Sequence, residues 1–336
     1  MKPALIIGST VADITVKLPA LPSTGQDVHI TGQSMSLGGC AFNVSEMLRR
    51  FQVPYLLFSP VGTGIYGDFV RQKLSEKQIP ICIPAPPEEN GCCYCFVEAS
   101  GERTFASLHG AEYRFLPQWF DLLDHEETGP AYVCGLELEE ETGQVILDYL
   151  KAHPAPELYF APGPRIGQIG WDKLSQMLDL SPVMHLNQRE ALECVQGLRR
   201  EMQGTCTLND ESDMDLSAGD FPSLDLGTAL PHLFETARAI QRRTGNVVII
   251  TLGSQGAVVC GADGSCLHIP AVPAHQVDTN GAGDSHVGTV IACRMMGMSF
   301  ADSVRTAARV AAAVVECQGT GLSDEAFCRL GLTPAP

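Results

Sequence analysis

Residues 277–286 carry side chains and a spacing that suit catalysis. Here Gly281-Ala282-Gly283 ends an extended approach and begins a long helical pattern, with Asp284 in its first turn. The backbone N–H groups at such a helix start lie at the positive end of the helix dipole, so they can bind an anion. A carboxylate beside this anion hole can take a proton from an alcohol while the hole stabilises charge on a transferring phosphoryl group. The other interpretation is an ordinary acidic residue in the first turn of a helix.

Short apolar runs alternate with longer helical patterns along the rest of the chain, and this alternation is typical of a parallel sheet with crossover helices. Most of the runs are continuously apolar, as expected for strands that are covered on both faces. The expected strands are residues 4–7, 55–59, 131–133, 158–160, 183–186, 247–251 and 257–260. The expected helices are residues 41–51, 67–77, 141–152, 230–244, 283–296 and 300–317.

Two segments differ from this alternation, residues 13–37 and 91–110, which read as polar-faced strands with turn residues between them. We expect them to form a small β-sheet that projects from the main sheet as a flap. Residues 196–225 are acidic and have little periodicity, which predicts a solvent-exposed insertion. We therefore expect one domain over residues 1–330, with a flap and one insertion.

The composition excludes several classes of partner. The 22 basic and 39 acidic residues give a net charge of −17, which disfavours nucleic-acid polymers and anionic membranes as partners. A small anionic ligand remains compatible, because a few N–H groups or a metal ion can reverse the potential inside a cleft. No signal peptide precedes the first strand and no run of 18 apolar residues occurs, so the 13 cysteines are expected to be reduced thiols in a cytoplasmic protein.

Five motifs resemble those of the ribokinase-like (PfkB) carbohydrate kinases, in family order and with family-like spacing. They are Asp278 to Asp284 (D-T-x-G-A-G-D), Gly38 to Asn43 (G-G-x-x-x-N), Asn187 to Glu190 (N-x-x-E), Thr251 to Gly256 (T-L-G-x-x-G) and the flap hairpin Gly101 to Thr104. One motif alone is a weak signal, whereas five in order are specific. The sequence is especially similar to an uncharacterised subgroup of bacterial sugar kinases. This resemblance implies a ribokinase-like three-layer α/β/α fold, with a central, mainly parallel sheet and a small β-sheet lid.

The resemblance also implies phosphoryl transfer from ATP to a hydroxymethyl group of a sugar or sugar-like molecule. Asp284 would then be the catalytic base, and the N–H groups of Gly281, Ala282 and Gly283 would form the anion hole. The sugar-binding residues would be Asp13, Gly38, Gly39 and Asn43. Glu137 and Arg165 are further candidates for substrate contacts, since each lies just past an expected strand.

The nucleotide and its metal would use a second set of residues. No P-loop is present, so a different glycine-rich turn and a metal must hold the phosphates. By resemblance, Asn187, Thr251, Gly253 and Gly256 would lie along ATP, and Glu190 would hold Mg²⁺ through its waters. A potassium site is a further implication, because four residues match the positions that hold K⁺ in relatives: Asp278, Asn280, Gly319 and Ser323.

Other functions fit parts of the sequence. A nucleoside kinase on the same scaffold would use the ribose 5′-hydroxyl, and Phe42, Phe105 or Tyr113 would then stack on the base. A non-catalytic sugar or nucleotide sensor is the alternative from another class, although it would not need the Asp284 carboxylate as a base. A dinucleotide-dependent oxidoreductase is excluded, because the first strand leads into residues 8–11 (G-S-T-V) and not into G-x-G-x-x-G.

The flap also suggests an oligomeric state. Cys93, Cys95 and Val97 would give one face of the flap an apolar surface, and such surfaces often pair between subunits. We therefore expect a homodimer formed through the lid.

Overall fold

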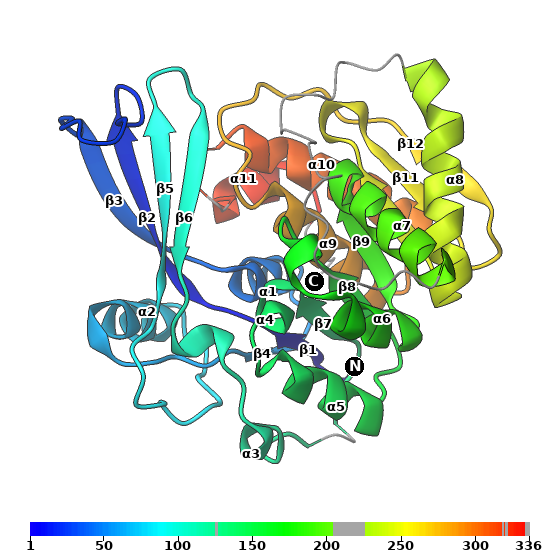
Figure 1. Cartoon of the computed structure of the whole chain (residues 1–336), viewed down its shortest axis with the longest axis horizontal. Helices are drawn as coiled ribbons and strands as arrows, with labels where there is room; N and C mark the ends of the chain where they lie inside the picture. Colours follow the sequence, from blue (N-terminus) through cyan, green and yellow to red (C-terminus); the bar gives the residue numbers. More distant parts are fainter. Residues whose placement is uncertain (125–126, 204–225, 318, 320–321, 333–336) are drawn as a thin grey trace.

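The computed structural model describes residues 1–124, 127–203, 226–317, 319 and 322–332 of the chain. Within these ranges the chain forms a large sheet with helices on both faces and a smaller sheet that stands beside it (Figure 1). None of the helices in these ranges is long and apolar enough to span a membrane.

The large sheet has the strand order β12-β11-β10-β9-β8-β7-β1-β4. The six strands from β10 to β4 pair in parallel, whereas β11 pairs antiparallel with both β10 and β12. Its strands are β1 (Ala4–Ile7), β4 (Tyr55–Phe58), β7 (Ala131–Cys134), β8 (Leu158–Ala161), β9 (Val183–Asn187), β10 (Val248–Thr251), β11 (Ala257–Cys260) and β12 (Cys266–Ile269). The expected strands are confirmed to within a residue or two. Strand β12 is not among the expected strands.

Helices cover the two faces of this sheet. One face is packed by α3 (Pro117–Phe120), α5 (Gly143–Ala152), α6 (Trp171–Asp179), α7 (Gln188–Gln203) and α8 (Leu226–Thr244). The other is packed by α1 (Cys40–Arg50), α2 (Gly64–Glu76), α9 (Ala282–Met295), α10 (Phe300–Val315) and α11 (Asp324–Arg329). The short α4 (Leu136–Glu139) and the 3₁₀ turns Ala111–Tyr113, Ile166–Gln168 and Gly253–Gln255 lie in the connections.

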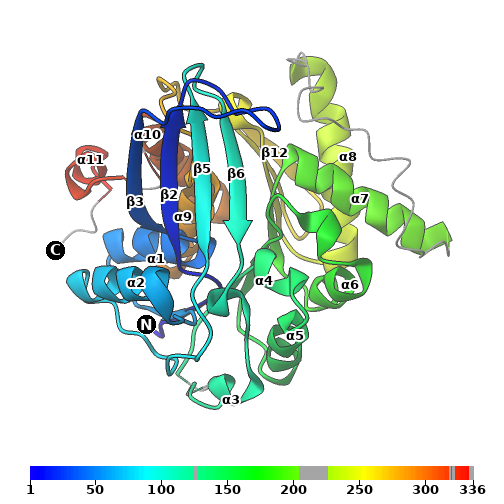
Figure 2. The same ribbon diagram turned by 60° about the vertical axis from the view of Figure 1, so that its left-hand side comes forward.

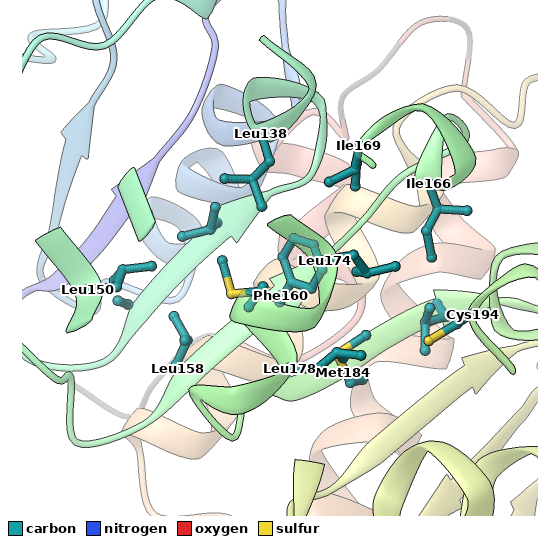
Figure 3. Close-up of a cluster of buried hydrophobic side chains, with 14 of the residues drawn as sticks. Leu138, Leu150, Leu158, Phe160, Ile166, Ile169, Leu174, Leu178, Met184 and Cys194 are labelled. Carbon is teal, nitrogen blue, oxygen red and sulfur yellow. The ribbon is translucent and has the colours of Figure 1, made fainter. Parts of the chain in front are cut away.

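Because successive strand residues point to opposite faces, β1 contributes to both hydrophobic cores. Leu5 and Ile7 belong to one core, and Ala4 and Ile6 to the other. Figure 3 shows the first core, in which Phe160 lies among aliphatic side chains from helices and neighbouring strands. Burial on both faces explains why these strands are continuously apolar in sequence.

The smaller sheet is the expected flap, and we refer to it as the lid. Its strand order is β3-β2-β5-β6, with β2 (Val11–Leu18), β3 (Gly32–Gly38), β5 (Cys92–Glu98) and β6 (Arg103–Leu108). Figure 2 shows these strands side by side above α1 and α2. Its apolar face, which includes Ile14 and Val16, packs with Tyr66 and Phe69 of α2. The opposite face is the polar one that carries Asp13.

The segment expected as an acidic insertion differs at its start. Helix α7 continues to Gln203, and Leu198 within it is buried against the core. The expectation of an insertion was therefore wrong for residues 196–203. The many charged residues of this segment conceal its helical period, in which Leu198 continues the core-facing side begun by Cys194 and Val195. The remainder, residues 204–225, lies outside the described residues.

Candidate active site

The expected catalytic turn lies at the beginning of α9. Gly281 precedes the helix with a left-handed backbone (φ 72°), which glycine adopts without a steric penalty. In the described part of the chain, the N–H groups of Gly281 and Gly283 have no backbone acceptor, whereas that of Ala282 donates to the Thr279 carbonyl at 3.3 Å. An added Cβ on Gly283 would contact nothing within 4 Å, so no neighbouring element of the described chain fills the space where a side chain would be. This turn can therefore receive an anion at two or three N–H groups.

Asp284 lies in the first turn of α9, and Asn43 of α1 reaches it. The Asn43 Nδ2 donates to Asp284 Oδ2 at 2.8 Å, across two elements far apart in sequence. The close approach of α1 and α9 explains this contact, because Gly288 leaves space where a Cβ would lie 2.9 Å from Met47 Cβ. The structure thus joins the G-G-x-x-x-N and D-T-x-G-A-G-D motifs at one carboxylate.

The two glycines before α1 are explained by their neighbours. A Cβ on Gly38 would lie 1.9 Å from an Asp13 carboxylate oxygen, so only glycine leaves room for that side chain. Gly39 has φ 98°, and a Cβ there would lie 2.5 Å from the Ser9 carbonyl oxygen. The missing side chain at Gly38 therefore lets Asp13 of β2 lie close to the start of α1.

The two carboxylates are tuned differently. Burial raises the pKa of Asp284 to about 6, while hydrogen bonds with Asn43 and Cys40 act to lower it. Burial, together with the charge of Asp284, raises the pKa of Asp13 to about 7. At neutral pH Asp284 is therefore mostly ionised and can accept a proton, and Asp13 can either donate to or accept from a hydroxyl group.

Glu137 and Arg165 follow the neighbouring strands β7 and β8, and each side chain already has partners within the protein. Glu137 is fully buried, and its Oε1 accepts from the Ser9 N–H at 2.7 Å. Its Oε2 is buried without a hydrogen-bond partner among the described residues, and burial raises the pKa of this carboxyl to about 7. Arg165 pairs with Glu139 at 2.8 Å and with His109 Nε2 at 2.7 Å. Glu137 therefore has an unused acceptor, whereas the Arg165 guanidinium is already paired.

Asn187 and Glu190 form a capping box at the start of α7. The Glu190 N–H donates to Asn187 Oδ1 at 2.9 Å, and Glu190 accepts from the Asn187 N–H and Nδ2 at 2.9 and 2.7 Å. Burial raises the pKa of Glu190 to about 7, and the charge of Asp284 contributes, so the two carboxylates lie within electrostatic range. Each Glu190 oxygen keeps a free lone pair that can accept from a metal-bound water, so the pair fits a magnesium ion held through its waters.

The remaining nucleotide-binding candidates follow β10. Thr251 at its end pairs in register with Asn187 at the end of β9, so both expected nucleotide motifs lie at the same edge of the sheet. This is the carboxyl edge, where open α/β sheets bind ligands. Gly256 (φ 97°) lies so close to the Ile269 carbonyl that a Cβ would come within 2.1 Å of it, and Gly253 also has a left-handed backbone.

A cavity of about 660 Å³ lies between the polar face of the lid and the 278–280 loop. Asp13 lies in its wall, together with hydroxyl and amide side chains of β2 and β3. Its walls are formed by Asp13, Thr15, Lys17, Thr31, Gly32, Gln33, Ser34, Ser36, Cys95, Val97, Arg103, Asp278, Asn280 and Gly319. Cys95 and Val97 thus face the cavity, so they do not form the outer apolar surface on which the expectation of a lid dimer rested. The dimer itself stays a prediction.

The four residues expected around potassium do not fit that ion. The Asp278 carboxylate accepts from the N–H groups of Asn280 and Gly319, at 2.8 and 2.6 Å, and pairs with Arg103 of the lid. Ser323 is exposed, and its Oγ accepts from the Ala326 N–H at 3.1 Å as the N-cap of α11. Hydrogen-bond donors and a guanidinium already occupy the carboxylate that was expected to be the main ligand.

Sequence reasoning missed two contacts of this site. Cys40, an unspecified position of the G-G-x-x-x-N motif, contributes to the pKa of Asp284 through a side-chain hydrogen bond. His286, two residues after Asp284 in α9, hydrogen-bonds the buried His185 of β9 at 2.8 Å. Burial lowers the pKa of both imidazoles, that of His286 to about 4, so the pair is neutral and ties α9 to β9. The one signal in the sequence is His185, a polar residue inside the otherwise apolar run of residues 183–186.

A parallel sheet with a lid and a carboxylate at a glycine-rich helix start together define a class, the small-molecule kinases of the ribokinase fold. The chain matches the pfkB family carbohydrate kinases over residues 1–212 and 223–326, and it belongs to this family. The unmatched residues 213–222 lie within the expected insertion.

Individual relatives agree with this assignment. The chain is 29% identical over 315 residues to the uncharacterized sugar kinase YegV of Escherichia coli, covering 94% of this chain and 89% of that protein. Its fold is similar to that of a Methanocaldococcus jannaschii nucleoside kinase (TM-score 0.71, 19% identity, 98% of both chains). It is also similar to an Arabidopsis thaliana ribokinase complexed with ribose and ATP (TM-score 0.68, 16% identity, 99% of both chains).

Proposed function

We propose that this kinase transfers the γ-phosphoryl group of ATP to a hydroxymethyl group of a sugar. One observation carries the proposal: Asp284, held by Asn43 at 2.8 Å, lies beside the free N–H groups at the head of α9. A base that is mostly ionised at neutral pH and an anion site within one helical turn are what an alcohol-to-phosphate transfer requires. The Arabidopsis relative bound to ribose and ATP supports the choice of substrates.

In this mechanism Asp284 accepts the proton of the hydroxyl group as the hydroxyl oxygen attacks the γ-phosphorus in line, and the bond from the γ-phosphorus to the bridging oxygen breaks to release ADP. The N–H groups of Gly281 and Gly283 stabilise the charge that spreads over the transferring group, with Ala282 adding its N–H if the weak turn contact to Thr279 opens. Magnesium, when bound, neutralises phosphate charge, and Glu190 with Asn187 would hold it through water.

The sugar itself would bind between the lid and α1. Asp13 and Asn43 can each contact two neighbouring hydroxyl groups, which suits a vicinal diol. The unused Oε2 of Glu137 is a further candidate acceptor. The lid would close over the sugar and exclude water, which otherwise competes as a phosphoryl acceptor.

Such an ATP-dependent enzyme with reduced thiols belongs in the cytoplasm, and the cysteines of the described residues are all free.

The second candidate acceptor is a nucleoside, and one observation favours it. Phe105 of β6 is 50% exposed and pairs in register with Cys95, whose side chain lies in the cavity wall. A base could therefore stack on its ring. The two other aromatic candidates do not offer a face, since Phe42 and Tyr113 are buried. The residues that line the cavity include no aromatic ring, so we favour a sugar.

The test is ADP release from the purified protein with Mg·ATP and a panel of pentoses, hexoses, sugar acids and nucleosides. We expect release with at least one sugar that carries a free hydroxymethyl group. Release with nucleosides alone, reduced by Phe105→Ala, would establish the second candidate. No release with any acceptor, together with measurable ATP or sugar binding, would contradict the kinase proposal and support a sensor.

A further inference from the structure

Asp278 is the most completely engaged carboxylate near the site. It is 4% exposed, its Oδ1 accepts from the Asn280 N–H, and its Oδ2 accepts from the Gly319 N–H. Its own N–H donates to the Val315 carbonyl at 3.0 Å, which fixes the residue to the end of α10. The residue that opens the D-T-x-G-A-G-D turn is therefore anchored on both its backbone and its side chain.

The positive charge that faces this carboxylate comes from the lid. Arg103 is the first residue of β6, directly after the hairpin turn at residues 99–102, and its Nη1 pairs with Asp278 Oδ1. The Arg103 side chain is only 16% exposed, and within the described residues Asp278 is its one carboxylate partner. In this arrangement the lid is linked directly to the turn that forms the anion hole.

A monovalent cation at the same place would have to compete with this ion pair. Such an ion would need the oxygens of Asp278 as ligands, and Arg103 Nη1 already pairs with Oδ1 while the N–H groups of Asn280 and Gly319 donate to the same carboxylate. The guanidinium would also repel a second positive charge within a few ångströms, where shielding by solvent is weak. The environment of Asp278 is therefore already neutralised.

We propose that Arg103 takes the place of a monovalent cation in this enzyme, so that lid closure supplies the fixed positive charge that holds the anion-hole turn. This inference rests on the proposed kinase function. Two consequences follow. The activity should not depend on K⁺, and the turn should be fully ordered for catalysis only when the lid is closed, because the charge moves with the lid.

The first experiment measures thermal unfolding without any substrate, in KCl, NaCl and choline chloride at equal ionic strength. The unfolding midpoint of the wild type should be the same in the three salts. Arg103→Gln should unfold at a lower temperature and be stabilised specifically by KCl, because Asp278 then has no cationic partner. A midpoint of the wild type that rises in KCl and not in choline chloride would overturn the proposal.

The second experiment measures turnover with an acceptor found in the panel, in the same three salts. The wild type should be indifferent to the salt, whereas Arg103→Gln should lose about tenfold in kcat, which corresponds to one lost charge-assisted hydrogen bond. KCl should restore part of that loss. Equal loss in all three salts, or a wild type stimulated by K⁺, would contradict the proposal.

Lys17→Gln provides the matched control. Lys17 is a second lid cation in the wall of the same cavity, and no described residue forms an ion pair with it. Removing its charge should leave the response to K⁺ unchanged in both experiments. If Lys17→Gln becomes K⁺-responsive as well, the effect is one of general charge and the assignment to Arg103 fails. If no acceptor yields ADP, the kinase proposal fails, whereas the unfolding experiment still decides the role of Arg103.

Discussion

Asp278 and Asp284 begin and end one seven-residue motif, yet their surroundings differ in kind. Asp278 is held by two backbone N–H groups and a guanidinium, so both of its oxygens are engaged in holding the structure. Among the described residues Asp284 has only side-chain partners, the Asn43 amide and the Cys40 thiol, and burial raises its pKa to about 6. A carboxylate that is partly desolvated, as Asp284 is, is poised to take a proton. Within this turn Asp278 stabilises the loop, whereas Asp284 is left free to react.

The largest expected effect is a loss of turnover when Asp284 is replaced. Asp284→Asn removes the base without changing the shape of the side chain, so kcat should fall by about 10²- to 10⁴-fold while ATP still binds. ADP release and calorimetric titration with ATP measure the two quantities. Turnover close to that of the wild type would show that Asp284 is not the base.

The second prediction separates the same acids by stability. Asp278→Asn places an amide NH₂ against one of the N–H groups that now donate to the carboxylate, and it weakens the pair with Arg103. The free energy of unfolding should therefore fall by about 2 kcal/mol. Asp284→Asn should change it far less, because that substitution removes a charge that is poorly solvated. Urea unfolding of both variants at pH 8 makes the comparison. Equal losses would mean that the two carboxylates do not differ as the structure indicates.

The third and smallest effect concerns pH. Because Asp284 must be ionised to act, kcat/KM should decline as the pH falls through about 6. The amide of Asn43 stabilises the ionised form, so Asn43→Ala should move this midpoint upward, by about one pH unit for a loss of 1.4 kcal/mol. Asn246→Ala, which removes an amide bonded to the Ser181 carbonyl, is the control and should leave the midpoint unchanged. A midpoint that stays at about 6 in Asn43→Ala would remove Asn43 from the tuning of the base.

Much of the fold was predictable because burial on both faces produces continuous apolar strands such as Ala4–Ile7, which can be recognised from the sequence alone. The capping box of Asn187 and Glu190 is also local, since both partners lie within one helical turn. Helix α7 shows the limit of such reasoning. Its many charged residues concealed the few positions that face the core, and only packing against the sheet makes them a helix face.

The sequence by itself determined the class of chemistry, because a glycine-rich helix start followed by an acid creates an anion site next to a base through local backbone geometry. It also determined the layers of the fold through its hydrophobic periodicity. Only the tertiary structure decided what each acid can do. Asn43 reaches Asp284 through the close packing of α1 and α9, and Arg103 reaches Asp278 from the lid. Contacts between residues so distant in the chain depend on how elements pack, and no spacing within a motif encodes them.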